Sequence, residues 1–112
     1  MIRGDVYDAR LSPTEGSEQA GMRPVIIVSR NAINDNSPVV VIVPLTDAAN
    51  VKRPYPNNVR IAAGEGGLPL DSVALAGQVR AIAVSRLLRH RGTLSADTLR
   101  AIDRALRITL DL

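Results

Sequence analysis

The sequence predicts a small, mainly β domain that ends in an α-helix. Two runs of β-branched residues, at 25–28 and 39–43, have the length and composition of buried strands. Clusters of Gly, Pro, Asn and Asp interrupt the chain at short intervals, as turns between short strands do. A helical spacing of apolar residues occurs only near the end, at Leu99, Ile102, Leu106 and Leu110. We therefore expect one domain, residues 1–112, in which five or six short strands form a strongly curved sheet or partly open barrel with a C-terminal helix.

The first half of the chain alternates strands with polar connections. The strands are expected at residues 6–9, 24–29 and 39–44. A turn at 13–16 is indicated by its Pro-Thr-Glu-Gly sequence, and the small polar residues at 16–21 favour a loop. Residues 31–38 contain three Asn and one Asp, which predicts a hairpin loop.

The second half contains shorter elements and the helix. We expect an irregular stretch at 47–56, a flexible break at 64–67, short strands at 58–61, 72–76 and 78–84, and a helical turn within 85–90. Ser95 is a suitable N-cap for the final helix, with Asp97 in its first turn. Asp103 and Arg107 have the i,i+4 spacing of an ion pair on the outer face of that helix.

Composition removes several functional classes. The chain has no cysteine, so disulfides and thiolate metal sites are excluded, and a reducing cytoplasm is a suitable environment. His90 is the single histidine, which excludes a pair of catalytic or metal-binding histidines, and we expect it at the surface. No apolar run approaches the roughly 20 residues of a membrane span. The formal charge of +3 agrees with a polyanionic partner and equally with an ordinary basic surface.

One loop carries an unusual group of functional side chains. Residues 16–24 place a hydroxyl, a carboxylate, an amide and a guanidinium directly before a buried strand. Arg23, at the start of that strand, is able to hold a phosphate through two parallel hydrogen bonds. The residues alone leave a simpler alternative open, in which Arg23 forms a surface ion pair with Glu15 or Glu18.

Three blocks of the sequence carry a resemblance to a known family. The first block reads R-G-D-V-Y at 3–7, followed by S-P-T-E-G-S-E-Q-A-G-M-R-P-V at 12–25. The second reads V-I-V-P-L-T at 41–46, and the third reads D-S-V-A-L-A-G-Q-V-R-A-I at 71–82. In this order they resemble the signature of the MazF/PemK toxin family, and together they span nearly the whole chain.

The resemblance implies a fold and an activity. The fold would be a small SH3-like barrel of the CcdB/PemK type with a C-terminal helix, assembled as a homodimer with an RNA groove along the dimer interface. The activity would be that of a cytoplasmic endoribonuclease toxin that cleaves single-stranded RNA, often mRNA, at short specific sequences. A MazE-like antitoxin would neutralise it. No metal or cofactor is expected, and no membrane association.

The resemblance also assigns site residues by position. Arg23 and Thr46 match the catalytic arginine and threonine of the family, and Glu18 matches an acidic loop residue implicated in catalysis in some members. Contacts to RNA are expected from Ser17, Gln19, Gln78 and Arg80. This chain departs from many relatives because Tyr7-Asp8 replaces an aromatic pair and few aromatic residues remain to stack on bases.

RNA supplies its own nucleophile, because its 2′-OH can attack the adjacent phosphate. The enzyme must then align the backbone and stabilise charge on the phosphate oxygens, a task suited to Arg23 with help from Thr46. Glu18 is expected either to remove the proton from the 2′-OH or to orient Arg23. Two other functions stay open from sequence: a CcdB-like poison of DNA gyrase, and a catalytically silent RNA-binding barrel.

Overall fold

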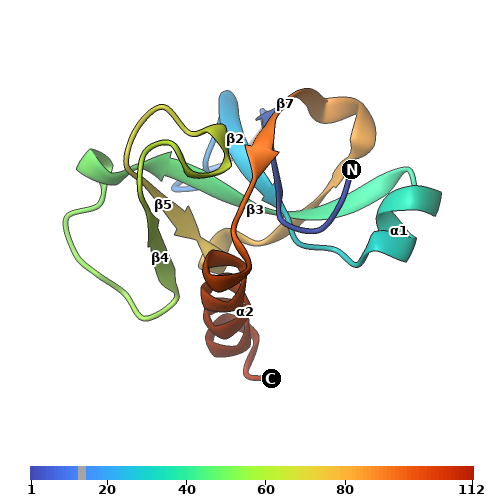
Figure 1. The fold of residues 1–112 in the computed structure, drawn as a ribbon. Helices are drawn as coiled ribbons and strands as arrows, with labels where there is room; N and C mark the ends of the chain where they lie inside the picture. Colours follow the sequence, from blue (N-terminus) through green and yellow to red (C-terminus); the bar gives the residue numbers. More distant parts are fainter. Residues whose placement is uncertain (13–14) are drawn as a thin grey trace.

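The computed structural model describes residues 1–12 and 15–112. Its β-strands are β1 (Asp5–Arg10), β2 (Met22–Ile27), β3 (Val39–Asp47), β4 (Asn58–Ile61), β5 (Ser72–Leu75), β6 (Arg80–Ala83) and β7 (Leu87–Thr93). The α-helices are α1 (Asn31–Asn36) and α2 (Ala96–Leu110), and single 3-10 turns occur at η1 (Ala48–Asn50), η2 (Glu65–Gly67), η3 (Ala76–Gln78) and η4 (Val84–Arg86). Figure 1 shows α2 below the sheet, with α1 and the connection between β3 and β4 on opposite sides of the molecule.

The strands form one curved antiparallel sheet in the order β4-β5-β3-β2-β1-β7, with β6 paired to β3. The long strand β3 is the centre, because its first half pairs with β6, its middle with β2 and its end with β5. The path begins at β4 and ends at β7, so the sheet is an open barrel and not a closed one. The predicted class, a mainly β chain with a C-terminal helix, is confirmed.

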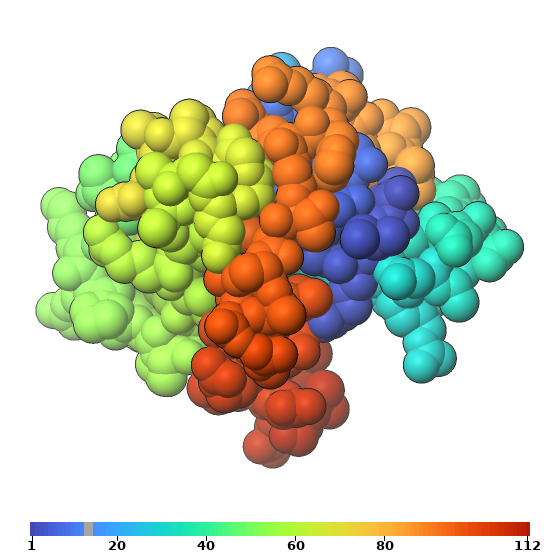
Figure 2. Space-filling model, viewed as in Figure 1, coloured from blue at the N-terminus to red at the C-terminus, as the bar shows by residue number. Residues whose placement is uncertain are grey.

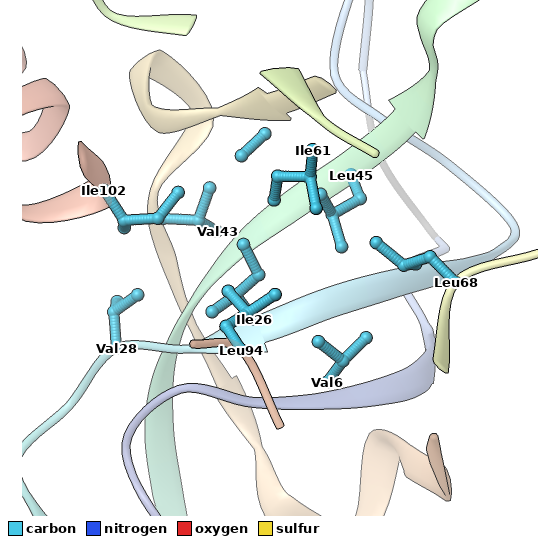
Figure 3. Packing of buried hydrophobic residues seen from close by; sticks show 10 residues of the cluster. Val6, Ile26, Val28, Val43, Leu45, Ile61, Leu68, Leu94 and Ile102 are labelled. Carbon is cyan, nitrogen blue, oxygen red and sulfur yellow. The ribbon is translucent and has the colours of Figure 1, made fainter. Parts of the chain in front are cut away.

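Two apolar clusters fill the two faces of this sheet. The main core, shown in Figure 3, brings together residues from strands β1 to β5 and from α2 with the connections between them: Val6, Ile26, Val28, Val43, Leu45, Ile61, Leu68, Ala74, Leu94 and Ile102. The second core lies on the other face and consists of Ala9, Leu11, Val25, Ile27, Val40, Ile42 and Ile82. Since both faces are covered, the central strands are apolar at nearly every position, which is why they read as continuous runs in the sequence.

Two predicted connections are regular elements instead. The expected hairpin loop at 31–38 contains the short helix α1, in which Asn34 is buried. The Asn34 amide donates to the Ser29 carbonyl oxygen (2.9 Å) and accepts from the Ser29 hydroxyl (2.5 Å). The expected helical turn within 85–90 is only η4, after which the chain extends as β7 and pairs with β1. The break predicted at 64–67 is the turn η2, whose buried Gly66 packs against β1 and β7.

The C-terminal helix agrees with its predicted start and differs in its ion pairing. The Ser95 hydroxyl accepts a hydrogen bond from the Thr98 N–H, which confirms the N-cap. Asp103 pairs with the distant Arg3 at 2.6 Å, so the predicted pair with Arg107 is wrong. The turn predicted at 13–16 lies partly outside the described residues.

The end of α2 leaves the body of the protein, as Figure 2 shows at its base. Ile108, Leu110 and Leu112 are exposed there. Among the described residues, no helix combines the length and the apolar character needed to cross a bilayer.

Candidate active site

Arg23 and Thr46 stand on neighbouring strands. Strand β2 pairs with β3 through Val25 opposite Pro44 and Ile26 opposite Val43. Continuing this register outward by two residues sets Arg23 opposite Thr46. The ladder ends before that point, since Pro24 and Pro44 have no N–H to donate. Two residues 23 positions apart in sequence are thereby brought together where the two strands part.

A cavity of about 320 Å³ opens at this point. We call it the arginine cavity, and its lining residues are Arg23, Pro24, Leu45, Thr46, Asp47, Asn50, Leu68, Pro69, Leu70, Ser72 and Arg91. The Arg23 Nε–H donates to the Ala20 carbonyl oxygen at 3.1 Å, which steadies the side chain, and neither terminal amino group has a hydrogen-bond partner among the described residues. No ion pair of Arg23 with Glu15 or Glu18 occurs among the described residues, so the simpler surface-pair alternative finds no support.

Thr46 is buried to 6% exposure, and Asn50 holds its hydroxyl. The Asn50 side-chain amide donates to Thr46 Oγ1 at 3.2 Å. Because that contact uses an oxygen lone pair, the hydroxyl proton of Thr46 is free to point at another acceptor. A permanently charged fork and a hydroxyl donor thus border one small cavity, a combination suited to a phosphate.

A second and larger cavity, of about 650 Å³, shares Thr46 and Asn50 with the first. We call it the tyrosine cavity, and it is lined by Gln19, Thr46, Asn50, Val51, Lys52, Arg53, Tyr55, Asn58, Leu75, Gly77 and Gln78. Tyr55 is 58% exposed, so one aromatic ring remains available at this wall. Basic, amide and aromatic side chains together are typical of surfaces that bind unpaired nucleotides.

The loop before β2 is tied to the tyrosine cavity by Gln78. The Gln19 N–H donates to Gln78 Oε1 at 2.8 Å, and Gln78 Nε2 donates to the Ser17 carbonyl oxygen at 3.3 Å. The buried Gln19 Oε1 has no hydrogen-bond partner among the described residues. Gln19 and Gln78 therefore lie at the cavity, whereas Ser17 takes part through its backbone.

Glu18 and Arg80 lie outside both cavities. The Glu18 carboxylate accepts from the Glu15 N–H at 2.9 Å within its own exposed loop. Arg80 begins β6 opposite Ile42, and one of its terminal nitrogens is buried without a partner among the described residues. The structure thus brings together Arg23, Thr46, Gln19 and Gln78, with Ser17 joined to Gln78 through its backbone, and it leaves Glu18 and Arg80 apart from them.

Sequence reasoning missed Asn50, Tyr55 and Arg91. Asn50 and Tyr55 belong to the stretch at 47–56, which was expected only to be irregular. Arg91 comes from β7, and its Nε lies 2.6 Å from Asp8 Oδ1. An Arg-Gly pair outside the signature blocks carries no signal of its own, so only the pairing of β7 with β1 reveals this residue.

A polar cluster on β1 and β7 surrounds Asp5 away from the cavities. Burial acts to raise the pKa of Asp5, but hydrogen bonds from the Thr93 hydroxyl and the Ile2 N–H, together with nearby His90, leave the pKa below its usual value. His90 Nε2 lies 3.4 Å from Asp5 and the His90 ring packs on Tyr7, whose pKa is raised by burial and by the charge of Asp5. His90 is 48% exposed, in agreement with its predicted surface position, and it lines neither cavity. In the described part of the chain, no three His, Cys, Asp or Glu side chains gather as metal ligands would.

Comparisons with known proteins agree on one family. A family model described as PemK-like, MazF-like toxin of type II toxin-antitoxin system matches residues 2–110. The chain is 38% identical over 117 aligned residues to Endoribonuclease MazF9 of Mycobacterium tuberculosis (strain ATCC 25618 / H37Rv), covering 100% of this chain and 98% of that protein. It is 42% identical over 110 residues to Endoribonuclease MazF of Staphylococcus epidermidis, covering 98% and 91%.

Solved structures share the fold over almost the full length. MazF from Deinococcus radiodurans superposes with a TM-score of 0.84 at 26% identity, covering 100% of this chain and 97% of that one. An endoribonuclease in complex with its cognate antitoxin, from a mycobacterial species, superposes with a TM-score of 0.82 at 28% identity, covering 100% and 96%.

Proposed function

The chain belongs to the PemK-like, MazF-like toxin family and is an endoribonuclease, and we propose that it cuts single-stranded RNA at a phosphate bound between Arg23 and Thr46. The observation that carries the proposal is the arginine cavity, whose lining brings Arg23 and Thr46 together just beyond the paired part of β2 and β3. Full-length similarity to endoribonucleases displaces the alternatives of a gyrase poison and a silent barrel.

The proposed reaction is an internal transfer of the phosphoryl group. The ribose 2′-oxygen attacks the adjacent phosphorus while its proton leaves to a base, the bond from phosphorus to the 5′-oxygen breaks, and that oxygen takes up a proton. The products are a 2′,3′-cyclic phosphate and a 5′-hydroxyl end. Arg23 stabilises the charge on the non-bridging oxygens through its two terminal amino groups, and the Thr46 hydroxyl donates to the same phosphate.

Glu18 can act as the general base only if its loop moves. Its carboxylate is now held by the Glu15 N–H, so it has to release that contact to approach the 2′-OH. A Glu18→Gln variant distinguishes the two roles left open by the sequence. Loss of the acidic limb of the pH–rate profile identifies a base, whereas an unchanged profile with a lower rate identifies a residue that only orients Arg23.

The tyrosine cavity supports a single-stranded substrate. Unpaired bases expose their edges and faces, and this wall offers the amides of Gln19 and Gln78 together with the ring of Tyr55. The Gln19 oxygen, which lacks a partner among the described residues, is buried, so it would accept from a base amino group only after the side chain turns into the cavity. We therefore place a base next to the scissile phosphate in this cavity, and reading of that base gives the cleavage its sequence preference.

We also propose an antitoxin partner and a homodimer. A structural relative is seen in complex with its cognate antitoxin, and this chain has the same fold over its whole length. An acidic antitoxin segment that folds on binding would cover the basic cavities and stop cleavage in the cytoplasm. Unchanged RNA cleavage in the presence of a saturating cognate antitoxin would refute inhibition.

The experiment that tests the proposed function maps the ends of a cleaved RNA. Purified protein is incubated with a long RNA in EDTA, and the new termini are identified. We expect cleavage without a divalent ion, leaving a 2′,3′-cyclic phosphate or 3′-phosphate and a 5′-hydroxyl. Strict dependence on Mg²⁺, or termini that carry a 5′-phosphate, would overturn the proposed chemistry.

A further inference from the structure

The arginine cavity is lined by a second arginine, Arg91, which does not belong to the signature loop. Arg91 belongs to β7, at the end of the sheet, and reaches the cavity where β2 and β3 part. Its side chain is 23% exposed, so it is neither solvated as a surface arginine would be nor sealed in the core. The family signature at 12–25 and 41–46 does not include this residue.

Two contacts fix the position of Arg91. The first is the bond of its Nε to Asp8 Oδ1 at 2.6 Å, a short charge-assisted hydrogen bond to a carboxylate that is 12% exposed. The second is backbone packing against η2, where a Cβ atom on Gly67 would lie 2.2 Å from the Arg91 carbonyl oxygen. Only glycine permits that approach, so η2 and β7 are pressed together beneath the arginine.

The contact with Asp8 uses one donor and leaves the rest of the guanidinium available. Among the described residues, Arg91 makes no other side-chain hydrogen bond. Its two terminal amino groups carry four N–H donors next to a cavity that also contains Arg23 and the Thr46 hydroxyl. A purely structural ion pair would need no such opening, because a partly buried pair is stabilised best when every donor is satisfied.

We propose that Arg91 is a second phosphate-binding residue of this nuclease and that Asp8 is the positioning residue that aims it. The ligand is a backbone phosphate of the RNA, either the scissile one or its neighbour, and the inference rests on the proposed function. Asp8 binds Arg91 through Nε, so both terminal amino groups of Arg91 remain for a phosphate, although the carboxylate offsets part of the positive charge at the site.

The test measures salt dependence as well as rate. Binding of an RNA oligonucleotide with a 2′-deoxy substitution at the cleavage site is followed across a series of NaCl concentrations. A lost phosphate contact lowers the steepness of log affinity against log salt by about 0.7 for a single strand. Arg91→Ala should show that change and an affinity at low salt reduced roughly ten-fold, the size of one hydrogen bond to a charged group.

Arg89→Ala is the matched control, since Arg89 is an exposed arginine on the same strand that lines neither cavity. It should keep the wild-type slope and rate. Arg91→Lys should keep the slope, because the charge remains, and lose single-turnover rate, because the fork is gone. The lysine variant also serves as the test if circular dichroism shows that Arg91→Ala does not fold.

The role of Asp8 is tested by whether its replacement lowers or raises the cleavage rate. Removing a carboxylate beside a phosphate site should by itself strengthen RNA binding, whereas loss of the positioning contact should slow cleavage. Asp8→Ala is therefore expected to cleave several-fold more slowly, and Asp8→Asn, whose amide oxygen still accepts from Nε, to recover most of the rate.

The inference is overturned if Arg91→Ala and Arg89→Ala behave alike, or if Asp8→Ala cleaves as fast as the wild type or faster. A wild-type protein that neither binds nor cuts RNA would instead contradict the proposed function itself, so the two failures are distinguishable.

Discussion

At the scale of single residues, Thr46 shows what the signature assigns and what only the fold supplies. The sequence block at 41–46 indicated a functional threonine, and the fold places it in the same cavity as Arg23. Nothing in that block indicates Asn50, whose amide holds the threonine hydroxyl, or Arg91, which reaches the same cavity from β7. Such partners could not be predicted because their contacts arise from turns and strand pairing between segments without a motif.

Two replacements of Thr46 distinguish the contribution of its hydroxyl to cleavage from that of its side-chain volume. Thr46→Ala should lower single-turnover cleavage of a short RNA about ten-fold, the effect of losing one hydrogen bond to a charged group. Thr46→Ser should keep most of the activity, since it retains the hydroxyl that Asn50 orients. Equal rates for the alanine variant and the wild type would show that the hydroxyl takes no part. Circular dichroism serves as the folding control, because the residue is buried.

At the scale of elements, apolar sequence patterns predicted secondary structure correctly, whereas polar segments did not reveal the elements that they form. The runs at 25–28 and 39–43 were placed correctly as strands because burial on both faces demands apolar residues throughout. Strand β7 was missed because its Arg-His-Arg sequence shows no alternation, and its place is set by pairing with β1. The helix α1 was missed as well, since Asn34 stabilises it through Ser29 and not through an apolar face.

The junction of β1 with β7 gives a prediction about acid stability. The pKa of Asp5 lies below its usual value in the folded protein, so the folded state binds this proton more weakly than the unfolded chain does. The stabilising contribution is complete above the unfolded pKa of about 4 and is lost as pH falls through the lower folded pKa.

Urea unfolding between about pH 6 and pH 3 measures this contribution, since the window brackets the usual carboxyl pKa. The wild type should lose free energy of unfolding toward the acid end, and Asp5→Asn should start less stable and lose less. Parallel pH dependences for the two proteins would show that Asp5 does not contribute.

At the scale of the whole molecule, the open sheet explains why the two cavities exist. Strands β2 and β3 separate beyond Pro24 and Pro44, and the chain between β3 and β4 forms the wall that holds Tyr55. A general barrel shape was predictable from the order of strands. The cavities were not, because they depend on where the pairing ends and on the course of a connection with no repeating pattern.

The shape of the tyrosine cavity predicts which form of RNA is cut. A cavity of about 650 Å³ beside Thr46 has room for a base only if that base leaves its partner strand. The protein should therefore cleave a single-stranded oligonucleotide and spare the same sequence in a duplex. A 2′-deoxy substitution at the cleaved nucleotide should abolish cutting and preserve binding, and gel analysis of both substrates checks this. Efficient cleavage of the deoxy-substituted strand would exclude attack by the 2′-OH.

The most direct test of the site is the single-turnover cleavage rate of Arg23→Ala on a short RNA. Arg104→Ala, which removes an exposed arginine from α2, and His90→Ala serve as controls and should cleave at nearly the wild-type rate. Arg23→Ala should be slower by at least about 100-fold, the usual loss when one preorganised donor to a developing charge is removed. Arg23→Lys should recover little, because a point charge does not replace the fork. A folded Arg23→Ala protein that cleaves RNA at the wild-type rate would contradict the assignment of the arginine cavity as the active site.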